Sequence, residues 1–394
     1  MNLASLDYCV IVLHIPWNRQ MNVLISGASM AGLSAAYWFA TLGHQVTVVE
    51  RSDGLRPGGA PIDVRGLALG TAERMGILQL ISEQKVALTG PMPVLDFKGK
   101  QVASLDLSWF ANETDNDVEI TRDRLNSILL NVIPSSVRFF YKETIASITD
   151  QGNSVDVLLA GGHKQSYDFV VGADGLHSNV RKLVFGPEKE FVHHFGYYVA
   201  LIDLPNDQNW DRGMLTVPGL TITVRFTGDG CQAMLLVASE ELKYDYRDRE
   251  LQRQLIKEFL SPLNVWQIPE LQKAFADPDS KGFYFDSVSQ THMHEWIKGN
   301  VAVIGDAGHC AALLSGMGTT LAMYSAEMLA TTLTEISGNI EEASPIYHQK
   351  LRNYVEQCQA FAHEGAPIMV PPTQQALDER NRTFIEFAEK FKQS

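Results

Sequence analysis

The stretch that most constrains this sequence is NVLISGASMAGLSAAYWFA, which runs from Asn22 to Ala40. An apolar run, a glycine turn and an alanine-rich segment predict a short strand that passes through a tight turn into a helix. Gly27 permits the turn and Gly32 permits close packing, while Ser29 stands where dinucleotide-binding turns usually have a second glycine. Free N–H groups at the start of such a helix favour a pyrophosphate, so the stretch predicts a nucleotide site.

The next segment supports this prediction. HQVTVVE reads as a second strand that ends in Glu50, about where a carboxylate binds a ribose hydroxyl in dinucleotide-binding units. Ser29 keeps a small side chain whose hydroxyl can itself donate to a phosphate. The alternative is an ordinary strand–turn–helix–strand unit with a glycine-rich turn and no bound nucleotide.

Charge and cysteine content argue against several other functions. The chain has 394 residues, 45% of them hydrophobic, and a formal net charge of −14 with no basic block, so no nucleic-acid partner is expected. The cysteines are Cys9, Cys231, Cys310 and Cys358. Their wide separation predicts neither a zinc site nor a disulfide framework, and it fits a reducing, cytoplasmic location.

The first twenty residues have a different character. CVIVLHIP is apolar but too short to span a bilayer, and its flanks do not match a signal peptide. We expect residues 1–20 to be an extension outside the fold, with Met21 as the natural start, although an added edge strand is the alternative. We expect no metal site, because no carboxylate or cysteine completes a ligand set beside His292 and His294.

Two further glycine–acid pairs follow predicted strands. YDFVVGADG leads into Asp174 and Gly175, and NVAVIGD ends in Asp306. Ligands of open α/β sheets bind at the carboxyl ends of strands, where both acids are expected to lie. In EITRDRLNSILL, Arg122 opens a predicted helix from which its side chain could approach a phosphate.

These motifs, in this order, resemble the flavin-dependent aromatic hydroxylases built like para-hydroxybenzoate hydroxylase, over Met21 to about Ala360. The resemblance implies an α/β fold: a Rossmann-like FAD-binding domain, an inserted antiparallel β-sheet domain for the substrate, and C-terminal helices. It implies that the ADP half of FAD lies at the glycine turn and at the acid ending the second strand, and that the later motifs bind the rest of the cofactor. The residues it assigns to FAD are Gly27, Ser29, Gly32, Glu50, Arg51, Arg122, Asp174 and Asp306.

Within that family, GGAPIDVRG and GFYFDSVSQ resemble the tetracycline-inactivating flavin monooxygenases. The resemblance brings Gly58 and Gly59 near the isoalloxazine ring, makes Asp63 a flavin-contacting acid and makes Arg56 a candidate for contact with the nicotinamide cofactor. The implied substrate is a polycyclic phenol or enol, with tetracyclines as the first compounds to test.

The loop after Asp306 departs from the family pattern. Relatives usually have proline there, then Gly-Gln-Gly and Asn, whereas this chain reads AALLSGMGTT. Gly316 and Gly318 keep the close backbone approach expected beside the flavin. Met317 and Thr319 change the lining, so they are candidate substrate contacts and leave the substrate's identity open.

The middle of the chain is rich in predicted β-strands. YYVALIDL, LTITVRF and CQAMLLVA predict an antiparallel sheet over the substrate, with Arg225 and Met234 as candidate pocket residues and a surface role as the alternative for Arg225. The expected division is residues 1–20 outside the fold, 21–187 with 282–340 for FAD, 188–281 for substrate, and 341–394 as C-terminal helices. The last predicted helix, Gln374 to Lys392, either packs on the fold or gates the substrate entrance.

The implied chemistry needs no catalytic side chain. In the family, NADPH reduces FAD, and oxygen then gives a flavin hydroperoxide that hydroxylates the substrate, while the protein orients the reactants and excludes water. We therefore expect a cytoplasmic, monomeric FAD monooxygenase with a small-molecule substrate, no nucleic acid and no membrane span. The alternatives are a hydroxylase of another polyketide or phenol, a flavoprotein oxidase or reductase that inserts no oxygen, and a non-catalytic FAD-binding protein.

Overall fold

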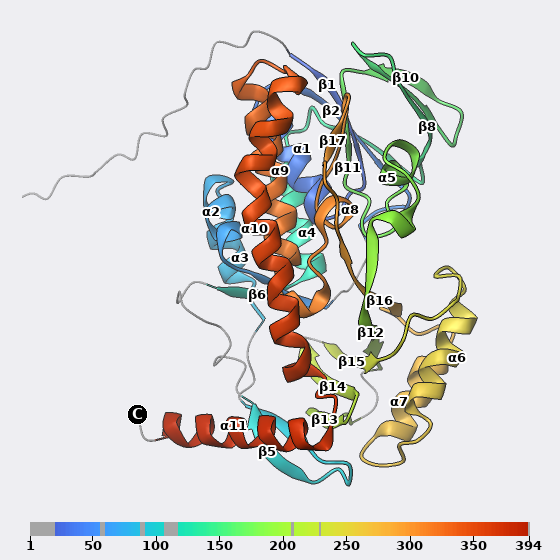
Figure 1. Cartoon of the computed structure of the whole chain (residues 1–394), viewed down its shortest axis with the longest axis vertical. Helices are drawn as coiled ribbons and strands as arrows, with labels where there is room; N and C mark the ends of the chain where they lie inside the picture. The colour runs from blue at the N-terminus through green and yellow to red at the C-terminus, as the bar shows by residue number, and fades with distance from the viewer. Residues whose placement is uncertain are drawn as a thin grey trace, which may run out of the picture.

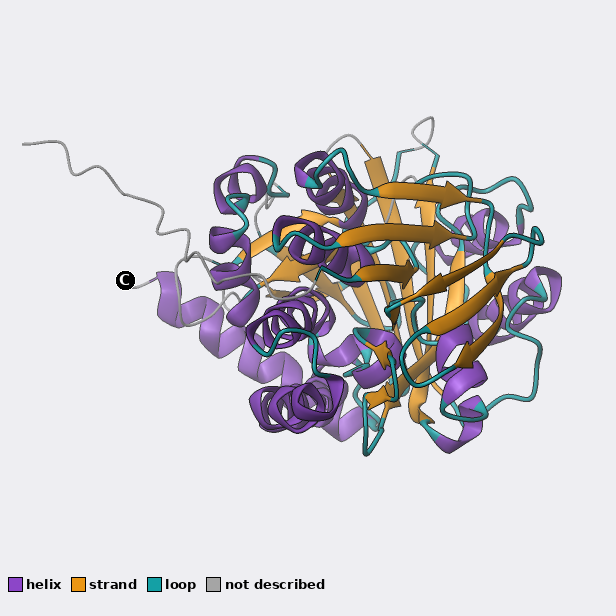
Figure 2. Cartoon of the chain, turned by 90° about the horizontal axis from the view of Figure 1, so that it is seen from above, coloured by secondary structure: helices purple, strands orange, loops and turns teal. Residues whose placement is uncertain are grey.

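A computed structural model describes residues 20–55, 60–86, 91–105, 117–205, 209–227 and 230–392. The expected extension before Met21 lies outside the described residues, apart from Gln20. Figure 1 shows one sheet in the upper half and a second in the lower half, with the long helix α10 running beside both. Seen from above, the strands lie together with helices grouped against them (Figure 2).

The upper sheet has six strands in the order β17-β18-β11-β1-β2-β7, and every neighbouring pair from β18 to β7 is parallel. The strands are β1 (Asn22–Ser26), β2 (Gln45–Glu50), β7 (Arg138–Tyr141), β11 (Phe169–Gly172), β17 (Ile297–Lys298) and β18 (Val301–Val303). Near-continuous apolar runs such as FVVG are typical of parallel strands buried on both faces. Because β1, β2, β11 and β18 are parallel, their carboxyl ends meet at one edge.

Helices of varied length accompany this sheet. They are α1 (Met30–Thr41), α2 (Leu67–Arg74), α3 (Leu78–Glu83), α4 (Arg122–Val132), α5 (Asn179–Val184), α8 (Asp306–His309), α9 (Gly318–Glu335) and α10 (Ile340–Met369). Helix α4 begins at Arg122, as the sequence predicts. Helix α10 continues through Pro367, because this proline falls in its last turn and interrupts little of the hydrogen-bonding ladder.

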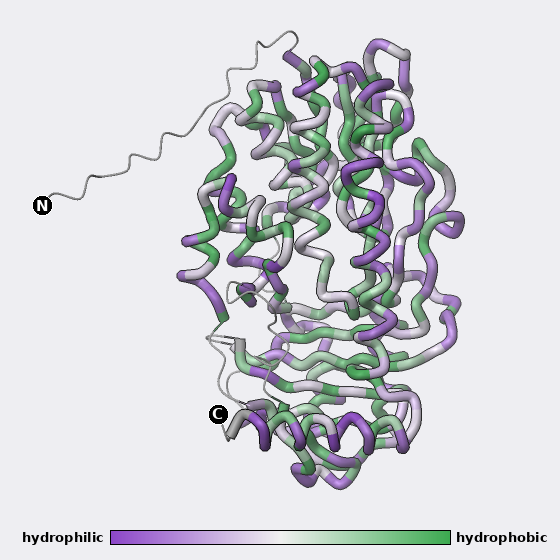
Figure 3. The backbone as a smooth tube through the Cα atoms, turned by 60° about the vertical axis from the view of Figure 1, so that its left-hand side comes forward, coloured by the Kyte–Doolittle hydropathy of each residue, from purple (hydrophilic) through white to green (hydrophobic). Residues whose placement is uncertain are grey.

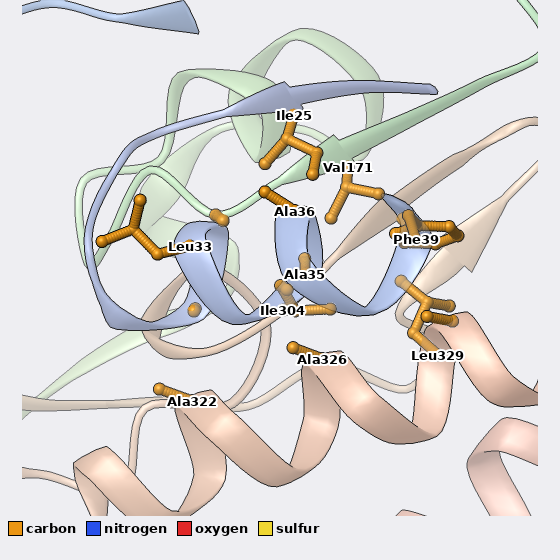
Figure 4. Close-up of a cluster of buried hydrophobic side chains, with 14 of the residues drawn as sticks. Ile25, Leu33, Ala35, Ala36, Phe39, Val171, Ile304, Ala322, Ala326 and Leu329 are labelled. Atoms are coloured by element: carbon orange, nitrogen blue, oxygen red, sulfur yellow. The ribbon is translucent and has the colours of Figure 1, made fainter. Parts of the chain in front are cut away.

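Helix α1 is buried between the sheet and α9. In Figure 4, Ile25 and Val171 of the sheet lie on one side of α1, and Ala326 and Leu329 of α9 lie on the other. A helix apolar all round fits such a position. Complete burial of a large side chain such as Phe39 contributes about 1.5–3 kcal/mol to folding, so this contact fixes the turn that precedes the helix.

The lower sheet has seven strands in the order β16-β12-β15-β14-β13-β4-β5. The strands are β4 (Met92–Leu95), β5 (Gln101–Leu105), β12 (Val192–Leu204), β13 (Gly213–Val217), β14 (Leu220–Thr227), β15 (Gly230–Ala238) and β16 (Tyr284–Thr291). Three of them, β4, β5 and β16, lie outside the range 188–281 that we expected to supply this sheet. Long-range pairing recruits them: β4 joins β13 in parallel, and β16 joins β12 antiparallel.

The two faces of the lower sheet have different partners. One face packs on α6 (Arg249–Leu260) and α7 (Ile268–Ala276), in a cluster that includes Ile222, Leu235 and Phe275. On the opposite face, Val199 and Leu236 pack with Ala312, Ala362 and Val370 from α10 and the loop after α8. This second face is turned toward the upper half of the molecule.

The remaining described elements are short. They are β3 (Pro61–Val64), β6 (Val118–Thr121), β8 (Ile145–Asp150), β9 (Val155–Leu159), β10 (Lys164–Tyr167) and the 3-10 turns η2 (Glu188–Glu190) and η3 (Leu313–Ser315). Strands β3 and β6 form an antiparallel pair, and β8, β9 and β10 form a three-stranded sheet. Hydrophobic residues are spread over strands and helices alike (Figure 3), and no helix among the described residues is long and apolar enough to cross a membrane.

The last helix, α11 (Gln374–Lys392), lies across the bottom of the molecule beside β5 and β13 (Figure 1). Leu377, Arg380 and Phe384 are buried and form one helical stripe, whereas Ile385 and Phe387 are exposed. Ile385, one residue beyond Phe384, leaves that stripe, whereas Phe387, three residues beyond Phe384, lies on it near the end of the helix. The gate role of this helix stays a prediction.

Candidate functional site

The turn between β1 and α1 is built by backbone contacts that exclude side chains. Gly27 has φ +105, and a Cβ on it would lie 2.4 Å from the carbonyl oxygen of Ala173 at the end of β11. A Cβ on Gly32 would lie 1.9 Å from the carbonyl oxygen of Gly27. Both glycines are therefore required by the close approach of β1, α1 and β11, as the sequence predicts.

The start of α1 has the character of an anion site. Ser29 is the N-cap residue, its side chain makes no capping hydrogen bond, and the first turn contains no acid. The Ser29 hydroxyl instead accepts a hydrogen bond from Nη2 of Arg122 at 2.9 Å. The guanidinium and the unpaired N–H groups of this twelve-residue helix therefore converge on one point, which suits a pyrophosphate.

Glu50 ends β2 beside the same turn. Its carboxylate accepts hydrogen bonds from the backbone N–H groups of Ala28 and Ser52, both at 2.8 Å. These contacts fix the carboxylate next to the glycine turn, where an adenosine ribose is expected. The next residue, Arg51, is exposed to solvent.

Asp174 organises the loop after β11. Its carboxylate accepts hydrogen bonds from the Ser178 hydroxyl and from the backbone N–H groups of Asn179 and Val180. Burial raises the pKa of this carboxyl, and these hydrogen bonds oppose the rise. The contacts give Asp174 a role in shaping the loop, and Gly175 beside it adopts φ +84. A direct cofactor contact for Asp174 stays a prediction.

Arg181 joins the two acid motifs. Its side chain is fully buried and donates to the carbonyl oxygens of Leu176 at 2.6 Å and Ala307 at 2.9 Å. Leu176 follows the first acid motif and Ala307 follows Asp306. This arginine therefore holds together two loops that lie far apart in the sequence.

Asp306 begins α8, shortly after the end of β18. Its side chain is exposed to solvent, yet surrounding protein desolvates the carboxyl and raises its pKa, while the Cys310 thiol and the Arg122 guanidinium oppose the rise. A group that is both solvent-accessible and surrounded by protein lines a cleft. Arg122 therefore faces Ser29 on one side of this cleft and Asp306 on the other.

The loop after Asp306 meets a second charged group. Asp63 and Arg65 on either side of the end of β3 form an ion pair, and the Arg65 carbonyl accepts a hydrogen bond from the Thr320 hydroxyl at 3.0 Å. Gly316 adopts the left-handed conformation, with φ +64, directly against the Arg65 guanidinium. Nε of Arg65 is buried without a hydrogen-bond partner. A buried unpaired donor beside a glycine turn fits a missing acceptor such as the flavin ring system.

The remaining loop candidates differ in accessibility. Gly318 begins α9, and a Cβ on it would have no atom within 4 Å. Met317 and Thr319 are buried, at 7% and 4% exposure, and Met317 belongs to the core of the upper half. Direct substrate contact by these two side chains stays a prediction.

The two pocket candidates of the lower sheet lie on one face. Strand register pairs Met234 on β15 with Thr223 on β14. Arg225 lies two residues after Thr223 on β14 and therefore on the same face of the sheet. Arg225 forms an ion pair with Glu119 at 2.9 Å, which ties β14 to β6. Burial raises the pKa of Glu119, and the Arg225 guanidinium opposes that rise. Both candidates are only partly buried, so they are accessible on the face turned toward the upper half.

One polar cluster was missed by the sequence analysis. Asp286 on β16 accepts a hydrogen bond from the Tyr284 hydroxyl at 3.2 Å and contacts Nε2 of His177 at 3.1 Å. Nδ1 of His177 contacts Glu188 at 3.0 Å, and its ring stacks on Tyr246 with centroids 3.8 Å apart. The only signal in the sequence was the alternation of polar residues in YFDSVSQ, which does not reveal partners about a hundred residues away.

Some expected site residues cannot be placed. Arg56, Gly58 and Gly59 lie outside the described residues. No group of three or more histidine, cysteine or acidic side chains in the described part of the chain is arranged to hold a metal ion.

The chain belongs to the FAD binding domain family, whose model matches residues 20–364. The uncharacterized protein Rv1260 of Mycobacterium tuberculosis is 37% identical over 90% of this chain and 96% of its own length. A flavin-dependent monooxygenase of Legionella longbeachae is 31% identical over 87% of this chain and 88% of its own. The crystal structures of tetracycline destructases Tet(51) and Tet(55), 28% and 29% identical, each have a TM-score of 0.81 and cover 94% of this chain and 96% of theirs.

The protein is thus an FAD-dependent monooxygenase that uses NAD(P)H and oxygen. The cleft fits the cofactor, because donors gather at the glycine turn while carboxylates lie at Glu50 and Asp306. Bound FAD supplies the oxygen activation, and the chain's own residues bind and orient the reactants and exclude water. The residues suited to hold FAD are Gly27, Ser29, Gly32, Glu50, Arg65, Arg122 and Asp306.

Replacing Gly27 with alanine should abolish FAD retention and lower the melting temperature. The new Cβ would lie 2.4 Å from a backbone oxygen at φ +105, which costs more than about 2 kcal/mol. Gly54→Ala is the matched control, because no atom lies within 4 Å of the position that its new methyl group would take. Flavin absorbance of the purified proteins and thermal unfolding measure both effects, and equal values for the two variants would contradict the turn geometry.

His177→Gln should destabilise the protein most at low pH. Desolvation lowers the pKa of His177, but the two carboxylates outweigh it and raise the pKa to about 9, from an ordinary value near 6.5. The charged imidazole therefore contributes fully to the free energy of unfolding below pH about 6.5, and this contribution is lost as pH rises through about 9. The other titratable groups that face this cluster include Arg181, Lys182, Tyr246 and Tyr284.

Chemical denaturation of wild type and His177→Gln between pH 6 and 10 measures this dependence. His163 is exposed, so His163→Gln is the control. Its free energy of unfolding should differ little from wild type and should not show the same dependence on pH. If the loss in free energy of unfolding caused by His177→Gln stays constant across this pH range, the imidazole is not held charged by its two partners.

Proposed function

We propose that this monooxygenase hydroxylates and thereby inactivates tetracyclines. The observation that carries the proposal is the likeness to tetracycline destructases Tet(51) and Tet(55), at 28% and 29% identity over 94% of the chain. At these sequence identities, the likeness supports a related function as well as a shared fold. The sequence stretches GGAPIDVRG and GFYFDSVSQ support the same branch.

The face of the lower sheet that is turned toward the upper half supports an elongated substrate. Tyr284, Leu201, Met234 and Thr223 occupy one cross-strand row over four neighbouring strands, with Tyr284 at the end nearest the cofactor residues Arg122 and Asp306. Three strand spacings give this row a length of about 14 Å, enough for a linearly fused four-ring system. Its middle is apolar, which suits the flat body of such a molecule and excludes water from it.

The candidate residues then have distinct roles. Arg225, held by Glu119 beside the row, binds an oxygen on the polar edge of the substrate and fixes which carbon faces the flavin. Asp63 contacts the flavin, and Met317 and Thr319 shape the cavity from behind the loop that contains Gly316. Residues 21–187 with 282–340 form the FAD-binding part, 188–281 contribute most of the substrate-binding part, and α11 gates the entrance.

Purified enzyme should consume NADPH and oxygen while tetracycline absorbance falls and the product gains one oxygen atom. Mass spectrometry and absorbance follow the product, with NADPH-free and anaerobic reactions as controls. No NADPH- and oxygen-dependent change in any tetracycline would refute this substrate. Hydroxylation of another aromatic polyketide in the same panel would then identify the alternative, and NADPH oxidation without oxygen insertion would identify an oxidase.

A matched pair of variants tests the role of Arg225. Arg225→Ala should lower kcat/KM for tetracycline by about 10- to 100-fold, because a charged hydrogen bond contributes about 1.5–3 kcal/mol. Arg138→Ala removes an exposed arginine from β7, at the far edge of the upper sheet, and should change kcat/KM little. Equal losses in both variants would remove Arg225 from the substrate site.

A further inference from the structure

Tyr284 belongs to β16, which is an edge strand of the lower sheet. Its exposure is 40%, yet surrounding protein desolvates it, and Asp286, Arg122 and Asp306 all act on it electrostatically. As for Asp306, accessibility combined with surrounding protein indicates a position on the cleft wall. Tyr284 therefore lies near the residues suited to hold the middle of FAD, although it comes from the opposite sheet.

The hydrogen bonding of Tyr284 fixes its chemical character. Its hydroxyl donates to Asp286, whose carboxylate also contacts the imidazole of His177. Desolvation and the neighbouring Asp286 carboxylate raise the pKa of the Tyr284 phenol well above its ordinary value, so the phenol keeps its proton. With that proton committed to Asp286, the phenol oxygen has only lone pairs to offer to the cleft.

The cleft thus divides by hydrogen-bonding role. Arg122, Ser29 and the N-terminus of α1 offer donors, which suit the acceptor-only oxygens of a pyrophosphate. Asp306 and Tyr284 offer acceptors, which suit hydroxyl groups. We propose that Tyr284 is a cofactor-contacting residue that accepts a hydrogen bond from a ribityl hydroxyl of FAD, opposite Asp306.

Asp286 and His177 are positioning residues in this arrangement. Asp286 is 7% exposed and holds the Tyr284 proton, and His177 holds Asp286 from the loop after Asp174. Glu188 and the ring of Tyr246 hold His177 in turn. The lower sheet is thereby linked to the cofactor through a tyrosine whose orientation is set from the upper half.

The affinity of the full chain for FAD tests the proposal. Tyr284→Phe keeps the ring and should weaken FAD binding about two- to tenfold, the range for one neutral hydrogen bond. Tyr167→Phe is the matched control, because Tyr167 lies on β10 of the three-stranded sheet, outside this cluster, and its loss of a hydroxyl should leave affinity unchanged. Recovery of FAD fluorescence on dilution of each holoenzyme gives the dissociation constants, and circular dichroism checks that each variant is folded.

FAD analogues that each lack one ribityl hydroxyl identify the group. The loss of affinity caused by Tyr284→Phe should disappear for one analogue and persist for the others. A loss of affinity of equal size for every analogue overturns the ribityl contact. His177→Gln should weaken FAD binding in the wild-type background but not in Tyr284→Phe. Additive losses in the double variant overturn the positioning role of His177, since a purely structural effect does not depend on the Tyr284 hydroxyl.

Asp306→Ala separates failure of this proposal from failure of the site. If Asp306→Ala weakens FAD binding and Tyr284→Phe does not, the site is correct and the tyrosine contact is wrong. If neither variant changes FAD affinity, FAD does not occupy the cleft beside these residues, and the proposal fails with the site.

Discussion

The contact on which the rest of the structure depends is the backbone approach between the β1–α1 turn and the end of β11. A Cβ on Gly27 would lie 2.4 Å from the carbonyl oxygen of Ala173, so no side chain fits between the strand ends. This contact brings the start of α1, Glu50 and the loop of Asp174 to one sheet edge. Burial of α1 against α9 keeps the turn in place, so the core and the cofactor site are built from the same helix.

Beyond this turn, one set of links acts within the upper half and another joins the two sheets. Arg181 holds the loop after Asp174 to the loop after Asp306, while His177, Asp286 and Tyr284 join the upper half to β16. Arg225 and Glu119 make a further link between β14 and β6. These ionic and hydrogen-bonded links set the distance between the walls of the cleft. Within it, the side chains that donate hydrogen bonds to the cofactor lie apart from those that accept them.

The local features of the cofactor site can be predicted from the sequence, whereas the long-range contacts cannot. Gly27, Glu50 and the start of α4 at Arg122 follow from turn chemistry, strand ends and a predicted helix start, which are short-range signals. The pairing of β4 with β13 and the contacts of His177 join segments about a hundred or more residues apart. No periodicity encodes such partners, so the sheet was expected to be narrower and the tyrosine cluster was missed. The exposure of Ile385 and Phe387 likewise depends on what α11 packs against.

The position of FAD in a crystal structure of the holoenzyme tests the central claim most directly. The account predicts the pyrophosphate at the turn formed by Gly27 and Ser29, within reach of Arg122, and the ribityl chain between Asp306 and Tyr284. Electron density for FAD away from the carboxyl edge of the upper sheet would contradict it, as would a fully occupied cofactor that makes no contact with Arg122 or Asp306.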